Sequence, residues 1–289
     1  MREQAERIAA RIPNINLRAN KIAESIWTGL HSRKKVGPGE SFWQFRKYEH
    51  GDPAQLIDWR RTAKTNEIFI QERELETVQN IVLWRDTSDS MNFTSDKNID
   101  KKIERANLII ITLSIVLAKS GENISLNGHK QKPLRGKSAT DFISEEILKN
   151  VENSHKEIPD ISEIKNNSHV IFIGDFLLPI SKLEESFKML SNKNIHASFV
   201  HIFDPSEHTL PYKGRVNFNS LEDDTSILIG NVESVKKDFI SNIESHYKKL
   251  KDLVLSYSWQ YLSHTTNNLP EEAIRSIYFS LSSYRKQSI

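Results

Sequence analysis

The sequence predicts an α/β fold, a doubly wound and mostly parallel sheet with helices on both faces. From residue 79 onwards, short apolar runs alternate with amphipathic stretches, which is the pattern of strand–helix–strand units. Two of these runs end directly before an aspartate, Asp86 and Asp175, at positions where parallel sheets usually carry their ligand sites. Helical stretches precede and follow this segment. We therefore expect three parts: residues 1–78, 79–230 and 231–289.

The composition is that of a globular protein. Of the 289 residues, 37% are hydrophobic and 27% are charged, which allows a buried core under a polar surface. The absence of cysteine excludes disulfides, thiol catalysis and cysteine-ligated zinc. The N-terminus lacks the apolar segment of a secretory signal, and the most apolar run, 108–118, is too short to span a bilayer. We expect a soluble, cytoplasmic protein without a membrane span.

The charge balance gives little information about partners. The formal net charge is +2, and the basic clusters at 31–35 and 59–61 are typical of solvated faces or of seams against acidic regions. Nucleic acid is the less favoured interpretation of these clusters. We expect no nucleic-acid partner.

Residues 1–78 are expected to form a helix followed by an extended arm. Apolar residues recur at helical spacing over 1–30, and Pro13 is expected to break this helix. The stretches 41–48 and 67–76 have the character of short strands and are separated by Gly- and Pro-containing turns.

The run "GDPAQLIDWRRTAK" (residues 51–64) allows two interpretations. Asp52 and Asp58 could form a catalytic pair with neighbouring arginines. An ion-paired corner, with Trp59 as its buried anchor, is the favoured interpretation.

The segment 79–230 supplies the expected sheet and most of its helices. Strands are predicted at 80–85, 123–129, 169–174 and 195–203, with a weaker one at 225–230, and helices at 100–119, 140–151 and 182–192. The tail is predicted to be helical. One apolar stripe runs from Val232 through Tyr257 to Tyr261, and Pro270 opens a shorter helix.

A row of oxygen-bearing side chains follows the first of these strands. Asp86, Ser88 and Ser90 stand on alternate positions, so in an extended segment they can point the same way. Thr140 and Asp175 are placed at other turns and strand ends. Carboxylate and hydroxyl oxygens suit Mg²⁺, Mn²⁺ or Ca²⁺ and not zinc. The alternative is that these residues only cap helices and end strands.

Two resemblances sharpen this choice. The motifs "DTSDSM", "GKSATD" and "IFIGDF" resemble the metal-ion-dependent adhesion site of von Willebrand factor type A domains. That resemblance assigns the metal ligands to Asp86, Ser88, Ser90, Thr140 and Asp175. Residues 25–95, with "GLHSRKKVGPGESFWQFRKYEHGDPAQLIDWRR" at their centre, are similar to the signature of the bacterial family known as domain of unknown function 58.

The resemblance implies a von Willebrand factor type A-like sheet and a binding role. In such sites the metal keeps an open position that an Asp or Glu of a protein partner completes, so no enzymatic activity is expected. Members of the bacterial family tend to accompany MoxR-type AAA+ ATPases. The resemblance therefore implies an adaptor or co-chaperone for such an ATPase and its client, with Mg²⁺ as the expected cofactor.

Two alternatives remain open. A metal-dependent hydrolase or phosphatase is one, but such enzymes need a second carboxylate as general acid where this chain has Ser88. The other is a structural module with a non-functional metal site. Arg85 suggests it, because a guanidinium next to Asp86 could pair with that carboxylate and compete with a cation.

Overall fold

The computed structural model describes residues 2–31, 42–49, 52, 54–65, 67–73, 78–129, 132–149, 158–221, 223 and 225–285. The chain divides into two compact units. The α/β unit comprises Met1–Gly29 and Gln79–Ile289, and the small unit comprises Leu30–Val78.

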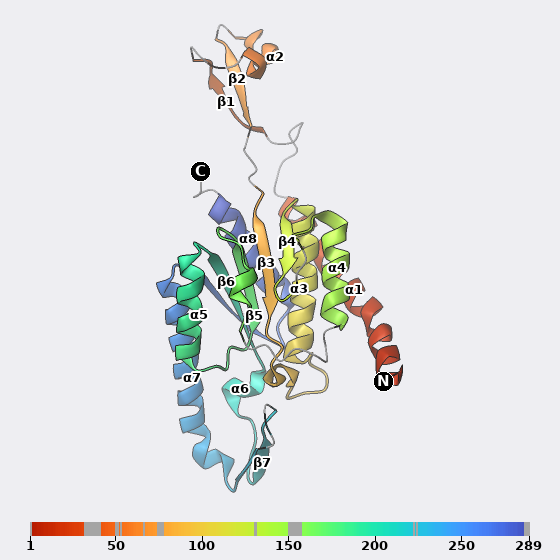
Figure 1. The fold of residues 1–289 in the computed structure, drawn as a ribbon, viewed down its shortest axis with the longest axis vertical. Helices are drawn as coiled ribbons and strands as arrows, with labels where there is room; N and C mark the ends of the chain where they lie inside the picture. The colour runs from red at the N-terminus through yellow and green to blue at the C-terminus, as the bar shows by residue number, and fades with distance from the viewer. Residues whose placement is uncertain are drawn as a thin grey trace. The chain divides into compact units, whose positions relative to one another are not determined.

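The α/β unit is built on a five-stranded sheet in which every pairing is parallel (Figure 1). The strand order is β4-β3-β5-β6-β9. Its strands are β3 (Asn80–Arg85), β4 (Asn123–Leu126), β5 (His169–Gly174), β6 (His196–Phe203) and β9 (Gln260–Thr265). The predicted α/β class is confirmed. Because all strands run the same way, their carboxyl ends meet at one edge of the sheet, called here the carboxyl edge.

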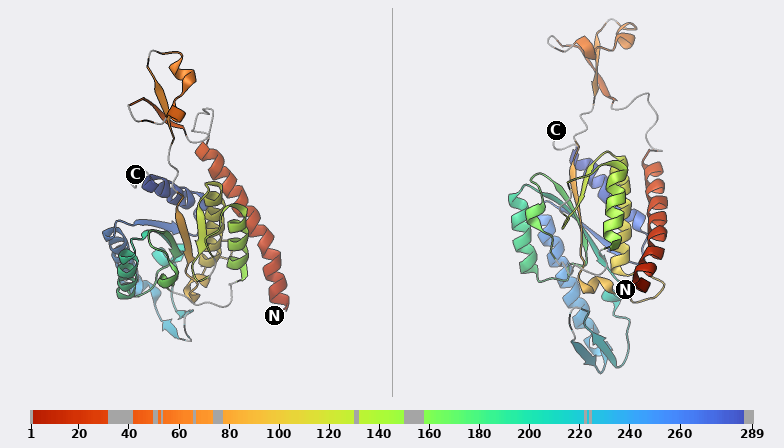
Figure 2. Two further views of the ribbon diagram at one scale, coloured as in Figure 1. Left: turned by 45° about the horizontal axis from the view of Figure 1, so that its top comes forward. Right: turned by 45° about the vertical axis from the view of Figure 1, so that its right-hand side comes forward.

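Helices cover both faces of this sheet (Figure 2). One face carries α3 (Lys102–Lys119), α4 (Gly136–Lys149) and α8 (Pro270–Arg285), and the other carries α5 (Ile180–Asn192) and α7 (Val232–Ser256). The centre of α3 is fully buried, since Leu108, Ile109, Ile110 and Ile111 are each 0% exposed. The opposite layer is aromatic. Trp84 of β3 and Phe172 of β5 pack there with Phe187 of α5.

The N-terminal helix belongs with the α/β unit and not with the extended arm. Helix α1 (Arg2–His31) runs through Pro13 without ending, so the predicted break is wrong. A proline removes one hydrogen bond, but the flanking turns can continue as helix. Ala19 and Ala23 are fully buried, and Arg18 pairs with Asp100 at 2.9 Å. The boundary predicted at residue 78 coincides with the end of the small unit, whereas residues 1–29, predicted as part of the arm, belong to the α/β unit.

The tail contributes a strand as well as helices. Helix α7 ends at Ser256, Ser258 adopts a left-handed φ of 58°, and Trp259 is buried. Tyr261 therefore lies in β9 and not on the predicted helical stripe. The strand joins β6 as the last strand of the main sheet. The residues after 230 are thus part of the sheet's own core and not only a helical addition to it.

Short elements lie near the carboxyl edge. The 3-10 helix η2 (Asp89–Asn92) follows β3, and α6 (Pro205–Thr209) follows β6. Beyond α6, β7 (Val216–Asn219) and β8 (Ser226–Ile229) pair as an antiparallel hairpin. The expected weak strand at 225–230 thus exists, but outside the main sheet. A further 3-10 helix, η3 (Ile161–Glu163), precedes β5.

The small unit contains β1 (Phe42–Lys47) paired antiparallel with β2 (Phe69–Arg73), the 3-10 helix η1 (Ala54–Leu56) and helix α2 (Trp59–Thr62). Asp52 accepts two hydrogen bonds of 2.7 Å from Arg46, and Asp58 caps α2 by accepting from the Arg60 and Arg61 amides. The ion-paired corner is therefore present. Trp59 is not its buried anchor, because it is 65% exposed at the start of α2.

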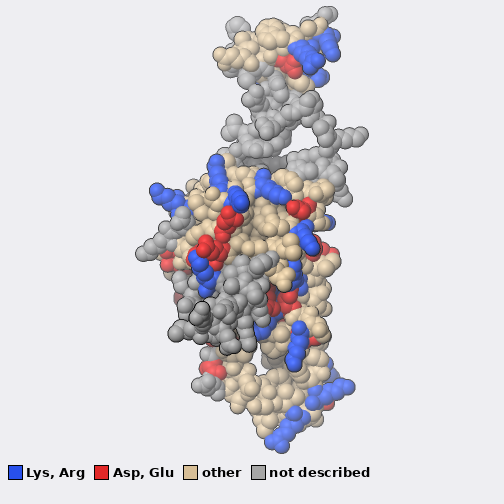
Figure 3. All heavy atoms as spheres, turned by 90° about the vertical axis from the view of Figure 1, so that its right-hand side faces the viewer, with Lys and Arg blue, Asp and Glu red and all other residues tan. Residues whose placement is uncertain are grey.

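Two surface properties bear on possible partners. None of the helices in the described part of the chain combines the length and the apolarity that a membrane crossing requires. Figure 3 shows Lys and Arg side chains interspersed with Asp and Glu on the α/β unit, with no continuous basic surface among the described residues of that face.

Candidate metal centre

The carboxyl edge of the sheet places Asp86 next to the end of β5. The amide of Asp86 donates to the Ile173 carbonyl at 2.8 Å, so the residue continues the pairing of β3 with β5 by one position. Its side chain is 2% exposed. One carboxylate oxygen, Oδ1, accepts the amide of Ser88 at 2.8 Å, which fixes the orientation of the carboxylate.

The two serines lie together beside Asp86. Ser88 begins η2 with an extended backbone, and its hydroxyl is 2.9 Å from the hydroxyl of Ser90. The predicted convergence of Asp86, Ser88 and Ser90 is therefore present as a local loop of oxygen atoms. The cause is the extended Ser88 followed by one turn of 3-10 helix.

Asp175 is the first residue after β5 and is 1% exposed. The preceding residue has to be glycine, because a Cβ on Gly174 would lie 2.6 Å from Asp86 Cβ. The following residue, Phe176, adopts a left-handed φ of 50° although it is buried between Trp84 and Phe199. Such a conformation costs a non-glycine residue roughly 1–2 kcal/mol. Aromatic packing therefore holds a strained turn directly after the carboxylate.

The cluster also contains a buried lysine that no motif in the sequence indicates. Lys102, the first residue of α3, is 1% exposed, and its ammonium donates to Asp175 Oδ2 at 2.8 Å. It also donates to Glu207 Oε1 at 2.6 Å. A buried ammonium with two carboxylates is well compensated. Nothing in the pair Lys101–Lys102 distinguishes the buried lysine from the exposed one before the structure is known.

Glu207 is held in place by the helix that carries it. It is the third residue of α6, and its Oε2 accepts the amide of Asp204 at 3.0 Å in a capping box. Asp204 in turn accepts the amide of Ser95 at 2.9 Å, from the loop between η2 and α3. The pattern Asp204-Pro-Ser-Glu207 signals a helix start in the sequence. It does not signal an ion pair with Lys102.

The cluster contains more negative than positive charge among the described residues. Asp86, Asp175 and Glu207 interact with one ammonium, that of Lys102. Burial, and then the charge of Asp175, raise the pKa of Asp86 to about 7, against the hydrogen bonds from Ser88. Burial also raises the pKa of Glu207, while Asp175 and Glu207 raise that of Lys102. A buried carboxylate without its own cation explains the shift at Asp86.

The excess of negative charge and the nearby side-chain oxygens fit the binding of a hard divalent cation. The four residues that could supply ligand oxygens are Asp86, Ser88, Ser90 and Asp175. Within the described residues, no group of three or more His, Cys, Asp or Glu side chains is placed to hold a metal ion. A cation here would therefore depend on hydroxyl oxygens and water to complete its shell, as Mg²⁺ commonly does.

Thr140 is not brought to this cluster. Helix α4 begins at Gly136, four residues earlier than predicted, so Thr140 lies inside the helix and its hydroxyl donates to the Lys137 carbonyl at 2.8 Å. Leu134, just before the helix, pairs with Ile124 near the amino end of β4. The carboxyl edge meets α4 at Ile147, about 10 Å further along the helix axis. The assignment of Thr140 as a ligand is not supported by this placement.

Arg85 does not pair with Asp86, contrary to the expectation of a competing guanidinium. Its side chain points to the opposite face of the sheet, where it donates to Asn107 Oδ1 and, at 3.2 Å, to the Ile147 carbonyl. Successive strand residues alternate between faces, which separates the two side chains. Burial lowers the pKa of Arg85 to about 10. The internal cation beside the carboxylates is Lys102.

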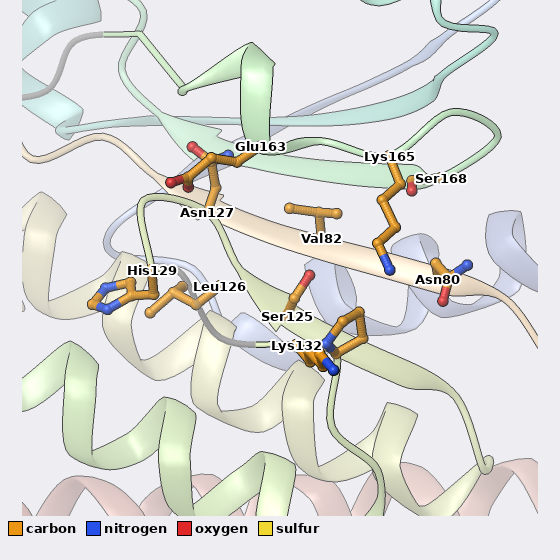
Figure 4. A pocket seen from close by; sticks show the side chains of 11 residues that line it. Asn80, Val82, Ser125, Leu126, Asn127, His129, Lys132, Glu163, Lys165 and Ser168 are labelled. Carbon is orange, nitrogen blue, oxygen red and sulfur yellow. The ribbon is translucent and has the colours of Figure 1, made fainter.

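A second candidate is a cavity of about 280 Å³ over β3 and β4, and its lining includes none of Asp86, Ser88, Ser90 and Asp175 (Figure 4). It opens over the first half of β3, at Asn80 and Val82, with Lys132 and Lys165 beside it. Both lysines are exposed. Exposed ammonium groups on a solvated face do not define a ligand chemistry, so the carboxyl-edge cluster is the stronger candidate.

Comparison with solved structures gives two distant similarities. The chain is similar to BatB, a conserved hypothetical protein from Bacteroides thetaiotaomicron, and to an aerotolerance-related membrane protein from Bacteroides fragilis NCTC 9343. Each similarity has 14% identity and a TM-score of 0.39, and covers 71% of this chain and 99% of the other. No curated protein matches this chain.

One family model matches most of the sequence. It is described as protein of unknown function DUF58, and it covers residues 44–249, more than half of the 289-residue chain. The match includes Asp86, Ser88, Ser90, Lys102 and Asp175, which form the cluster at the carboxyl edge. The chain therefore belongs to the DUF58 family.

Proposed function

We propose that this protein is a non-enzymatic, von Willebrand factor type A-like adaptor that binds another protein through a cation held at the carboxyl edge. Asp86, Ser88, Ser90 and Asp175 would hold Mg²⁺, or alternatively Mn²⁺ or Ca²⁺. When bound, the cation supplies an open coordination position for a carboxylate oxygen of the partner. The observation that carries the proposal is the buried pair Asp86 and Asp175, whose negative charge Lys102 only partly neutralises.

The hairpin of β7 and β8 supports a protein partner. It lies beyond the same end of the sheet as the cluster (Figure 1). Ile227 and Leu228 on β8 are 65% and 55% exposed. Neighbouring strand residues point to opposite faces, so both faces of the hairpin present an apolar side chain. These exposed apolar side chains offer contact area to a protein partner at the same end of the sheet as the cluster.

The proposed partner is a MoxR-type AAA+ ATPase together with its client, with the adaptor acting as a co-chaperone in the cytoplasm. This part of the proposal rests on the family resemblance alone. The two alternatives are weaker. A hydrolase would need a general acid where Ser88 is hydrogen-bonded to Ser90. A purely structural module would leave the charge excess at Asp86 without a role.

The test is calorimetric titration of Mg²⁺ and Mn²⁺ into the wild type and Asp86→Ala, with Asp141→Ala as the control. Asp141 is an exposed aspartate on α4, far along the chain from the cluster. We expect binding to the wild type and the control, and none to Asp86→Ala.

Copurification with the ATPase, with and without EDTA, then tests the adaptor role. Partner binding that depends on Mg²⁺ and on Asp86 supports it. Partner binding that Asp86→Ala leaves intact would support the structural alternative instead.

A further inference from the structure

We propose that Lys102 is an internal competitor for the cation site and sets its affinity for divalent ions. The inference rests on the proposed function, because it concerns the same carboxylates. In the free protein the ammonium of Lys102 occupies Asp175, and a divalent ion binds only when that ammonium gives up its hydrogen bond.

The contacts of Asp175 show what a cation has to displace. Its Oδ2 accepts from Lys102 at 2.8 Å, and its Oδ1 accepts the Leu177 amide at 3.3 Å. The better of the two hydrogen bonds is therefore the charged one to Lys102. Lys102 and Asp175 side chains are 1% and 2% exposed, so water screens their attraction little. A divalent ion that binds Asp175 must compete with this bond.

Glu207 gives the displaced ammonium a second carboxylate. Lys102 already donates to Glu207 Oε1 at 2.6 Å, while the capping box with Asp204 holds Glu207 in place. When Asp175 turns to a metal ion, Lys102 keeps one charged partner and is not left buried without compensation. The exchange therefore costs one hydrogen bond of Lys102 and not the whole burial energy of an ammonium.

The burial of Lys102 excludes a more direct role in binding a partner. Its ammonium lies beneath the ring of Phe93, 6.0 Å from the ring centroid, and it has almost no exposed surface. It cannot contact another protein. It lies between the two carboxylates and out of reach of solvent. Its hydrogen bonds go to Asp175 and Glu207, and its charge also reaches Asp86.

The first test compares Lys102→Met with Lys101→Met by calorimetric titration of Mn²⁺. Methionine keeps the length of lysine and removes its charge. Lys101 is exposed and one residue away, so the control removes the same charge without touching Asp175. We expect Lys102→Met to bind Mn²⁺ at least about tenfold more tightly than the wild type, and Lys101→Met to stay within about twofold, since a charge in solvent is strongly screened.

Three results would overturn the inference. Equal or weaker binding by Lys102→Met would show that Lys102 does not compete, while wild-type binding would leave the proposed function standing. An equal gain in Mn²⁺ affinity in Lys101→Met would show that the gain comes from the lower net charge of the protein and not from the loss of a competitor at Asp175. No binding by the wild type or by Lys102→Met would overturn the inference and the metal site of the proposed function together.

A measurement on the wild type covers the case in which Lys102→Met does not fold. NMR of the lysine side-chain ammonium groups reports the hydrogen bonds that each ammonium makes. We expect the Lys102 resonance to shift on saturation with diamagnetic Mg²⁺, because one of its two carboxylate partners is lost, while the resonance of the exposed Lys101 stays in place. An unchanged Lys102 resonance while Mg²⁺ binds would contradict the competition.

Discussion

Two buried basic residues lie near the end of β3, Arg85 on the strand itself and Lys102 at the start of α3, and they differ in their partners. Arg85 donates to an amide oxygen of Asn107 and to a backbone carbonyl, and burial lowers its pKa to about 10. Lys102 donates to two carboxylates, and these raise its pKa despite equal burial. Burial alone therefore does not decide the role of a basic side chain. Its partners do.

The two sites differ in the groups that surround the basic side chain. Around Arg85, neutral oxygens of α3 and α4 accept its hydrogen bonds. Around Lys102, carboxylates outnumber the one ammonium among the described residues. We therefore expect a structural role for Arg85, and we expect any exchange of cations at the Lys102 cluster.

The largest effect is expected from Asp175→Asn. The substitution replaces the charged hydrogen bond between Lys102 and Asp175 with a neutral one, while Glu207 still compensates the ammonium, which should lower the free energy of unfolding by about 1.5–3 kcal/mol. Urea unfolding of the purified protein measures this. Lys149→Met, which breaks an exposed pair with Glu145 on α4, serves as the control and should leave the urea midpoint unchanged. Equal effects of the two variants would mean that the Lys102 pair is no more important than a surface pair.

A pH dependence is expected from Asp86. Its pKa is raised to about 7 in the folded protein, above the ordinary value of 3.8, so the folded state holds its proton more tightly. The contribution of Asp86 to stability is therefore highest below pH 4 and is lost as the pH rises towards 7, by up to about 1.4 kcal/mol per pH unit. The check is the difference in unfolding free energy between the wild type and Asp86→Asn from pH 4 to 8. If the difference in unfolding free energy stays constant from pH 4 to 8, the pKa of Asp86 is not raised and the cluster does not carry an excess of negative charge.

A smaller loss is expected from Arg85→Met. The substitution leaves the Asn107 amide oxygen and the Ile147 carbonyl without their donor, at a cost of about 1–3 kcal/mol, but no charge is left uncompensated. Cation binding should not change, because Arg85 faces away from Asp86. Urea unfolding and Mn²⁺ calorimetry on this variant measure both. Loss of Mn²⁺ binding would show that the Arg85 site and the cation site are coupled.

The smallest effect is expected from Thr140→Ala. Its hydroxyl donates within α4, far from Asp86, so the affinity for Mn²⁺ should stay within about twofold of the wild type. Calorimetry measures it directly. A tenfold loss would restore Thr140 to the ligand set and would require a different arrangement of α4.

Much of the fold could be predicted from the sequence because the apolar runs form buried strands of the sheet and the longer apolar stretch forms a buried helix. The apolar runs before Asp86 and Asp175 became β3 and β5, and the helix expected at 100–119 became α3. The tail was harder to predict. Tyr261 continues the helical spacing of α7, but the left-handed Ser258 ends that helix and lets β9 pair with β6. The pairing of β9 with β6, which are far apart in the sequence, therefore outweighed the helical spacing of the apolar residues.

The candidate site was predictable only where its residues follow one another closely. Asp86, Ser88 and Ser90 could be placed together from their spacing, and Asp175 from its strand end. Lys102 and Glu207 could not, because their contact joins α3 to α6 across 105 positions of the chain. Thr140 was misplaced because Gly136 begins α4 one turn earlier than the motif suggested. The side chain that decides the electrostatics of the site is therefore visible only in the folded structure.

Anomalous diffraction from crystals soaked in Mn²⁺ would show which cation Asp175 holds. We expect one strong anomalous peak within coordination distance of Asp86 and Asp175, with the ammonium of Lys102 withdrawn to Glu207 alone. A peak at another position, or a bound Mn²⁺ with the bond from Lys102 to Asp175 unchanged, would contradict this expectation.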